Sequence, residues 1–328
     1  MNNKITFLFA GQGSQYYQMG RELYLQLPVF KAHVDWLDHH VQAQAGFSVV
    51  QLLYAPDARR GARFDRLRYT HPALFIIQYA LARTLMDAGI RPQCVLGLSL
   101  GECVALSVAG VVCPEQMLTA LLQQSRVLER DCPAGGMLAV LRGPEFFAAQ
   151  PALFSGSELA AVSTPQLICV AATSAVLDSV GRRLKQQQIA CERLPLLQPF
   201  HSSHLDPLQG RLLQIFAQCR FAPARMAVVS SMQMGLVSQV DPAMLWQIKR
   251  APICFWQTLQ HLPVDPEMIF IDVGPGGTLT NFIKHSATAH AHNRLYSILS
   301  PAGRCLQNYL NCIRECSNVN NAVVQSVA

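Results

Sequence analysis

A serine stands at the centre of the pattern GLSLG at residues 97–101, between a short apolar run and a stretch with helical spacing. A GxSxG pattern at a strand-to-helix junction is typical of a nucleophile elbow, where a tight turn exposes the serine hydroxyl. Glycines on both sides leave room for that turn, and the free amides of the helix N-terminus favour a developing oxyanion. The pattern predicts Ser99 as a catalytic nucleophile; the alternative is a tight turn without chemistry.

A serine nucleophile needs a base within hydrogen-bond reach. Among the ten histidines, two occur in the segment QPFHSSHLDP at 198–207, which follows a strand-like run. We expect His201 to be the base and His204 to make local hydrogen bonds. No acidic residue is obviously placed in the Ser–Asp–His order of an α/β-hydrolase. A backbone carbonyl near Ala251 and Pro252 is therefore the expected partner that orients the imidazole.

The segment GQGSQ at residues 11–15 follows another apolar run. A glycine-rich turn after a strand invites a dinucleotide-binding interpretation, but Tyr16 replaces the third glycine of G-x-G-x-x-G. Gln12 suits a different role, in which its backbone amide points at the oxyanion. The alternative is a tight turn with no part in catalysis. An oxidoreductase is therefore disfavoured.

The elements that must position these residues alternate between apolar runs and helical patterns, which is typical of an α/β protein. We expect strands at 5–9, 94–98 and 269–273 and helices at 71–85, at 102–110 and from Pro114 onward. The middle of the chain has a different pattern, with strands expected at 137–141, 167–171 and 191–197 and a helix at 174–188. This pattern predicts a compact α+β insert between the nucleophile and the base.

Composition narrows the class of protein. The 328 residues are 51% hydrophobic and 14% charged, which indicates a substantial core and disfavours disorder. The net charge of +6 is scattered, so it suits an acidic partner protein better than a nucleic acid. Eleven cysteines without a CxxC pair argue against a structural metal and indicate reduced thiols in a cytoplasmic protein. No apolar run reaches the length of a secretory signal or a membrane span, so we expect no membrane association.

Four segments carry a family resemblance: GQGSQ at 11–15, GLSLGE at 97–102, PFHSSHLDP at 199–207 and DVGPGGTL at 272–279. In this order and spacing they resemble the malonyl-CoA:acyl carrier protein transacylase family over about residues 4–300. The resemblance implies an α/β fold, with an α/β-hydrolase-like large subdomain and an inserted ferredoxin-like small subdomain. The bounds we expect are 1–131 and 198–316 for the large subdomain, 132–197 for the small one and 317–328 for a flexible tail.

The resemblance also implies a mechanism. Ser99 corresponds to the acylated nucleophile and His201 to the general base, while the backbone amides of Gln12 and Leu100 form the oxyanion hole. No cofactor or metal is implied, because the substrate arrives on the phosphopantetheine of a carrier protein or as acyl-CoA. We expect a monomer whose partners are the acyl carrier protein domains of a polyketide synthase.

One departure from the family concerns the helix after the elbow, where malonyl transferases carry an arginine that pairs with the malonyl carboxylate. The corresponding position here is Gln124, and Arg126 lies two residues further on. Two residues are about 200° of helix rotation, so we expect Gln124 to face inward and Arg126 to face solvent. A neutral amide cannot replace the lost charge. Removing one partner of a buried ion pair costs roughly 3–5 kcal/mol, or about two to three decades of affinity, so malonyl should be a poor substrate.

Two further positions differ from the family. Leu98 replaces the usual histidine before the nucleophile, and His71 replaces a usual glutamine; together with Phe200 and Gln124 we expect them to line the acyl pocket. These departures resemble the stand-alone acyl hydrolases of polyketide synthases that recruit acyltransferases in trans. That branch removes stalled short acyl groups from carrier proteins. The alternatives are a malonyltransferase that supplies extender units in trans and, less favoured because the catalytic residues are present, a non-catalytic carrier-protein-binding module.

Overall fold

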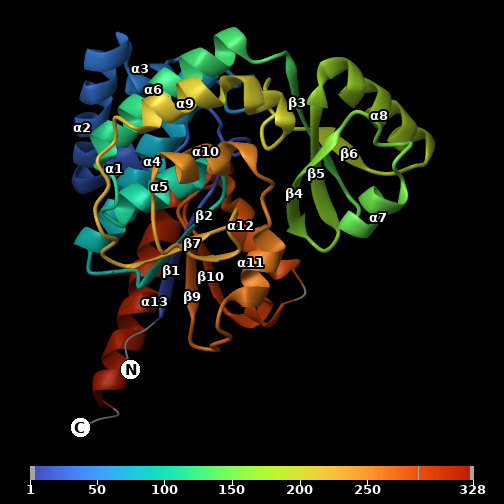
Figure 1. The fold of residues 1–328 in the computed structure, drawn as a ribbon. Coiled ribbons are helices and arrows are strands. Elements are labelled where there is room, and N and C mark those ends of the chain that lie inside the picture. The colour runs from blue at the N-terminus through green and yellow to red at the C-terminus, as the bar shows by residue number, and fades with distance from the viewer. Residues whose placement is uncertain (1–3, 287, 326–328) are drawn as a thin grey trace.

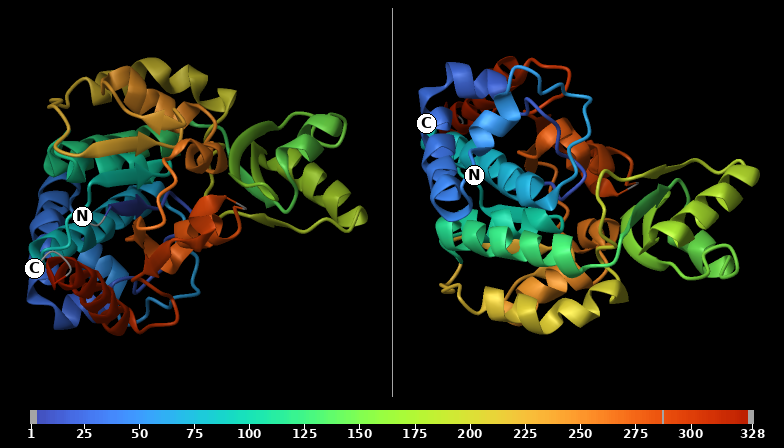
Figure 2. Two further views of the ribbon diagram at one scale, coloured as in Figure 1. Left: turned by 90° about the horizontal axis from the view of Figure 1, so that it is seen from below. Right: turned by 90° about the horizontal axis from the view of Figure 1, so that it is seen from above.

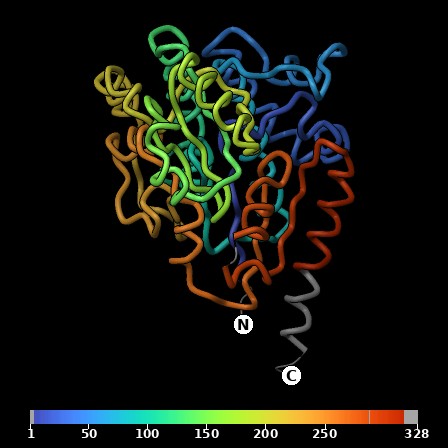
Figure 3. Tube along the Cα trace, turned by 90° about the vertical axis from the view of Figure 1, so that its right-hand side faces the viewer, coloured from blue at the N-terminus to red at the C-terminus, as the bar shows by residue number. Residues whose placement is uncertain are grey.

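The structure is a computed structural model that describes residues 4–286 and 288–325; for residues 317–325 it describes the backbone alone. The chain forms a large subdomain and a smaller one, which contains the green and yellow-green strands and helices at one side of Figure 1. Figure 3 views the molecule from the side of the small subdomain, whose trace lies in front of the large subdomain.

A six-stranded sheet organises the large subdomain, in the order β10-β9-β1-β2-β7-β8. All neighbours pair in parallel except β8, which joins the edge in the antiparallel direction. Their bounds are Ile5–Phe9 (β1), Cys94–Gly97 (β2), Ala227–Ser230 (β7), Gly235–Leu236 (β8), Ile269–Asp272 (β9) and Arg294–Ser297 (β10). Every residue of β1 and β9 is buried, as expected for central parallel strands covered on both faces.

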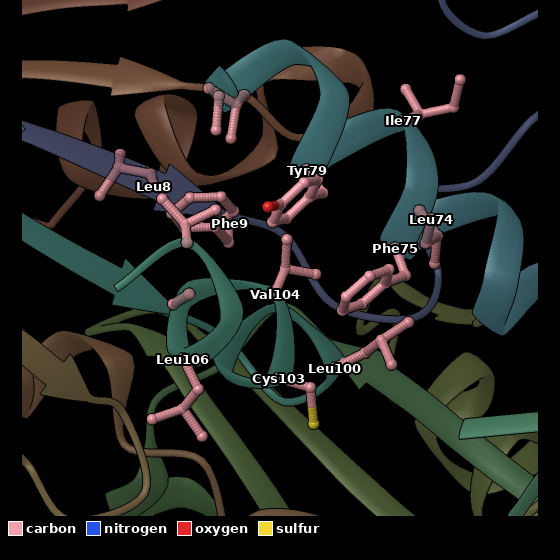
Figure 4. Packing of buried hydrophobic residues seen from close by; sticks show 14 of the residues in the cluster. Leu8, Phe9, Leu74, Phe75, Ile77, Tyr79, Leu100, Cys103, Val104 and Leu106 are labelled. Carbon is pink, nitrogen blue, oxygen red and sulfur yellow. The ribbon is translucent and has the colours of Figure 1, made fainter. Parts of the chain in front are cut away.

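Helices cover both faces of this sheet (Figures 1 and 2). Their bounds are Arg21–Gln26 (α1), Pro28–Ala45 (α2), Val49–Tyr54 (α3), Leu67–Asp87 (α4), Leu100–Val108 (α5), Pro114–Asp131 (α6), Gln209–Phe216 (α9), Pro242–Arg250 (α10), Phe255–His261 (α11), Thr278–Lys284 (α12) and Cys305–Gln325 (α13). Where α4 meets α5, Figure 4 shows Phe75 and Tyr79 beside Leu100 and Val104, all of which belong to the hydrophobic core. Within the described residues, no helix is long and apolar enough to cross a membrane.

The small subdomain is a four-stranded antiparallel sheet in the order β4-β5-β3-β6, with two helices against it. Its elements are Gly135–Val140 (β3), Pro144–Ala149 (α7), Glu158–Thr164 (β4), Leu167–Thr173 (β5), Ser174–Gln186 (α8) and Cys191–Arg193 (β6). The succession βαββαβ is the ferredoxin-like arrangement. Leu138, Ile168, Val170 and Leu177 belong to a hydrophobic core separate from that of the large subdomain. The fold class implied by the resemblance is therefore confirmed.

Several expected elements have different bounds or were missed. The strand expected at 191–197 ends at Arg193, because Pro195 has no N–H to donate to a sheet. Helix α5 begins two residues earlier than expected, directly after the serine. Strand β4 was not predicted, since its alanines carry little strand propensity.

The C-terminal segment also differs from expectation. Residues 317–325, expected in a flexible tail, continue helix α13 to Gln325. The helix contains neither proline nor glycine, so nothing in its sequence ends it at residue 316. The last three residues of the expected tail, 326–328, lie outside the described part of the chain.

Candidate active site

The four sequence segments meet at one edge of the large sheet. Segment 11–15 follows β1 and segment 97–102 follows β2, and these two strands are paired in parallel. Their carboxyl ends therefore point the same way, toward the edge where open α/β sheets bind ligands. A cavity of ≈ 160 Å³ lies there, and residues of both subdomains line it, including Ser99 and His201 from the large one and Met137 and Ala161 from the small one.

The backbone at Ser99 has φ 54° and ψ −114°, a conformation that residues other than glycine rarely adopt. The flanking glycines explain how the turn closes. A Cβ on Gly97 would lie 2.3 Å from the Cα of Glu102, and one on Gly101 would lie 1.9 Å from the carbonyl oxygen of Phe9. Both positions exclude any side chain, so the turn holds the serine at the start of α5.

The structure brings His201 to this serine. Ser99 Oγ lies 2.9 Å from His201 Nε2, and His201 Nδ1 lies 2.8 Å from the carbonyl oxygen of Ala251. Because the carbonyl can only accept, Nδ1 carries the proton and Nε2 offers its lone pair to the serine hydroxyl. His201 also has a positive φ of 59°, and its own N–H donates to the carbonyl oxygen of Lys249. Two residues with constrained backbones thus form a hydrogen-bonded pair beside the cavity.

Burial controls the electrostatics of this pair. It lowers the pKa of His201 to about 4, assisted by the positive charge of Lys249 and opposed by the hydrogen bond to Ala251. The imidazole is therefore neutral over the physiological range and able to accept a proton. His204, the other histidine of the segment, makes a different set of contacts: its Nδ1 lies 3.3 Å from Ser202 Oγ and 3.8 Å from a carboxylate oxygen of Glu158.

The two residues expected to form an oxyanion hole, Gln12 and Leu100, both line the cavity beside Ser99. Leu100 is the first residue of α5, so its amide has no partner within the helix. The segment that carries Gln12 is held by Gln78, whose side-chain amide exchanges two hydrogen bonds with the backbone of Ala10, of 2.7 Å and 3.0 Å. Gln78 was not identified from the sequence, where the available signal was a polar residue in the middle of an apolar helix.

Three of the four residues expected in the acyl pocket, Leu98, His71 and Phe200, line the cavity. Gln124 does not: it is fully buried and lies behind His71, with its Nε2 3.3 Å from His71 Nδ1. This part of the expectation is wrong, because the glutamine side chain ends at the histidine ring. Burial lowers the pKa of His71 to about 3, with a smaller contribution from the charge of Lys249, so this ring is neutral too.

Helix α6 places Gln124 and Arg126 on opposite sides, as the helical spacing predicts. Gln124 is completely buried, whereas Arg126 is exposed and its Nη2 donates to the carbonyl oxygen of Gln44, 3.3 Å away. Apart from Lys249, the described residues that line the cavity include no arginine, lysine, aspartate or glutamate. The described residues also include no group of three or more histidine, cysteine, aspartate or glutamate side chains placed to hold a metal ion.

Two buried carboxyl groups support the site from behind, and neither was identified from the sequence. Asp272, in the DVGPGGTL segment, accepts hydrogen bonds from the amides of Gly274, Leu279 and Thr280 and so holds the start of α12 against the cavity. Glu102 accepts hydrogen bonds from the hydroxyls of two serines on and after β7, which ties α5 to the sheet. Burial raises the pKa of each carboxyl to about 7.

The chain is similar to known acyltransferases in sequence and in fold. The chain is 34% identical over 308 residues to the polyketide biosynthesis acyltransferase homolog PksD of Bacillus subtilis, covering 94% of this chain and 95% of that protein. It is 35% identical over 301 residues to BaeD of Bacillus velezensis, which has the same description, covering 92% and 93% of the two chains. In fold it is similar to the malonyl CoA-acyl carrier protein transacylase of Clostridium perfringens, with a TM-score of 0.81 at 23% identity over 97% of this chain and 99% of that one.

The sequence also matches the acyl transferase domain family over residues 6–310. This match spans both subdomains and includes the elbow serine, the histidine beside it and the two loops that face them. The chain therefore belongs to the acyl transferase domain family.

Proposed function

We propose that this protein is an acyl hydrolase of a polyketide synthase, which removes stalled short acyl groups from carrier-protein thioesters through an ester on Ser99. The two relatives described as polyketide biosynthesis acyltransferase homologs support the link to polyketide synthesis, because the similarity covers nearly all of both proteins. The acyl transferase family supports the covalent mechanism.

In the first half of the reaction, Ser99 Oγ attacks the thioester carbonyl while His201 Nε2, 2.9 Å away, takes the hydroxyl proton. The amides of Gln12 and Leu100 face the oxyanion of the tetrahedral intermediate. Collapse of this intermediate breaks the carbon–sulfur bond, and His201 returns its proton to the departing thiolate. The acyl group is then an ester on Ser99.

In the second half, a water molecule takes the place of the thiol. His201 removes one of its protons as it attacks the ester carbonyl, and the same two amides again face the oxyanion. Ser99 leaves with the proton from His201, and a free carboxylic acid is released. The chemistry differs from acyl transfer only in the nucleophile that attacks the ester.

The observation that carries the choice of substrate is the neutral amide at position 124. In malonyl transferases the corresponding arginine pairs with the malonyl carboxylate, whereas Gln124 is buried behind a neutral His71. A carboxylate that entered this cavity would lose its hydration without gaining that partner, at a cost of roughly 3–5 kcal/mol. The apolar wall suits short neutral acyl groups instead.

Malonyl transfer to a carrier protein is the second candidate, and Lys249 favours it. This residue is the one lysine or arginine among the described residues that line the cavity. A non-catalytic binding module is disfavoured by the hydrogen-bond distance between Ser99 and His201.

Intact-mass analysis of carrier proteins tests the proposal. The protein is incubated with acetyl-loaded carrier protein and, separately, with malonyl-CoA and carrier protein that bears a free phosphopantetheine thiol. The proposal expects loss of the acetyl mass in the first reaction and little or no gain of malonyl in the second. Efficient malonyl loading with no loss of acetyl would replace the hydrolase proposal with the transferase one. Ser99→Ala serves as the control for both reactions.

A further inference from the structure

Lys249 occupies an unusual environment for a lysine. It lies at the end of α10, lines the catalytic cavity and is only 2% exposed. Its backbone carbonyl accepts the hydrogen bond from the N–H of His201 described above. The residue therefore contributes its backbone to the position of the base. Its positive charge adds to the effect of burial in lowering the pKa of His71 and of His201, which both line the same cavity.

The side-chain ammonium group has few hydrogen-bond acceptors around it. Among the described residues its hydrogen-bond partner is the thiol of Cys103, with Nζ 3.2 Å from Sγ. An ammonium group has three donors, and a thiol sulfur is a weak acceptor. A buried charge that lacks strong acceptors is unfavourable unless something else supplies them.

One possible acceptor within the protein is the carboxyl group of Glu102, the residue before Cys103 on α5. Its oxygens already accept hydrogen bonds from the hydroxyls of Ser230 and Ser231 and from the amide of Met232. Burial raises the pKa of this carboxyl group, and the charge of Lys249 opposes that effect. Among the described residues no ion pair joins the two side chains, so Glu102 does not satisfy the donors of the ammonium group.

We propose that Lys249 is a specificity determinant whose ammonium group donates a hydrogen bond to an oxygen atom carried by the acyl chain of the substrate. The thioester carbonyl is not that oxygen, because the amides of Gln12 and Leu100 face it in the mechanism above. The acceptor must lie further along the chain, as in a 3-hydroxyacyl or 3-oxoacyl group. This inference rests on the proposed function and names its preferred substrates: short acyl groups that bear an oxygen beyond the thioester.

A carboxylate carries the same kind of acceptor, so the experiment must separate a neutral oxygen from a charged one. We would measure kcat/KM of the wild type for hydrolysis of butyryl and 3-hydroxybutyryl thioesters of pantetheine, and for transfer of malonyl to a carrier protein. A hydrogen bond from a charged donor predicts a preference of about tenfold or more for 3-hydroxybutyryl over butyryl. Equal values would overturn the inference without any variant.

Lys249→Met should remove this preference, because methionine has similar length and no donor. The preference is a ratio within one protein, so a general loss of activity cancels. Lys249→Gln keeps a neutral donor and should give an intermediate ratio. Lys284→Met, at an exposed position of α12, removes the same charge outside the cavity and should keep the wild-type ratio.

The outcomes separate the inference from the proposed function. If butyryl and 3-hydroxybutyryl are both hydrolysed but the ratio is the same in the wild type and in Lys249→Met, the role of Lys249 is wrong and the hydrolase proposal stands. If the wild type transfers malonyl efficiently and Lys249→Met does not, the lysine binds an acyl-chain oxygen as inferred, but the hydrolase proposal fails.

Discussion

The two walls of the catalytic cavity are built in different ways. The wall that carries Ser99, Leu100 and Gln12 consists of turns directly after β1 and β2, where strained backbone and excluded side chains determine the geometry. The rest of the lining comes from elements that lie far apart in the sequence, including α4, the strands of the small subdomain, α10 and α12. Packing between such elements positions their polar residues, as where His71 of α4 lies against Gln124 of α6.

This difference separates chemistry from selectivity. The turns require particular glycines and a serine, so any member of the family that keeps the reaction must keep them. The helices require only that the cavity be filled, so their inward residues can change without damage to the fold. Under the proposed function, we expect the glutamine at position 124 and the lysine at position 249 to change what the cavity binds while the acyl-serine chemistry stays the same.

The largest effect is expected at the nucleophile. Ser99→Ala should abolish acylation and turnover, because the elbow presents no other hydroxyl to the substrate. Incubation with an activated acyl thioester should add one acyl mass to the wild type and none to the variant. Acylation of Ser99→Ala at the wild-type rate would show that the covalent mechanism is wrong.

Loss of the base should be the next largest effect. His201→Ala should slow acylation and hydrolysis by about 10²–10⁴, the usual range for a positioned general base. His204→Ala is the matched control in the same segment and should do much less, since its ring contacts Ser202 and Glu158. Stopped-flow rates of acyl-enzyme formation provide the measurement, and equal losses in the two variants would contradict the assignment.

A charge introduced behind the cavity should shift selectivity by about one to two decades. Gln124→Arg adds a positive charge behind His71, and the longer side chain would displace that ring toward the cavity, where it could pair with a malonyl carboxylate and leave less room for neutral chains. The ratio of kcat/KM for acetyl hydrolysis to that for malonyl transfer should therefore fall. An unchanged ratio would mean that position 124 does not distinguish the two reactions.

At pH 5.5, kcat/KM should be about tenfold higher than it would be if the base were a histidine of ordinary pKa. Only the neutral imidazole accepts a proton, and burial lowers the pKa of His201 to about 4. The acid limb of kcat/KM should therefore lie near pH 4, so activity at pH 5.5 stays close to its neutral value. A limb near pH 6.5 would show that the base is not buried in the active protein.

The smallest effect is expected at Arg126, on the outer side of α6. Its side chain is exposed and hydrogen-bonded to the backbone of Gln44, away from the cavity. Arg126→Ala should leave both kcat/KM values within about twofold of the wild type, since exposed substitutions rarely affect a site they do not touch. A selective loss of malonyl transfer would identify Arg126 as the residue that binds the carboxylate.

The catalytic wall was predictable from sequence, and much of the specificity wall was not. The GLSLG pattern indicated the turn at Ser99, and helical spacing placed Gln124 inward and Arg126 outward, because both rest on local geometry. Spacing could not show that His71 comes between Gln124 and the cavity, which depends on how α4 packs against α6. It also could not identify Lys249, because a lone lysine in a helix is expected at the surface until the fold buries it.

The fate of the ester on Ser99 is the most direct test of hydrolysis by water against transfer to a carrier protein. The acetyl-enzyme would be formed from a small acetyl thioester in ¹⁸O-labelled water, and its mass followed with and without a carrier protein that bears a free thiol. If water resolves the ester, the acetyl mass disappears at the same rate in both cases and the released acetate carries one labelled oxygen. An acetyl-enzyme that persists until the carrier protein is added, and then passes its acetyl group to the carrier thiol, would contradict hydrolysis by water.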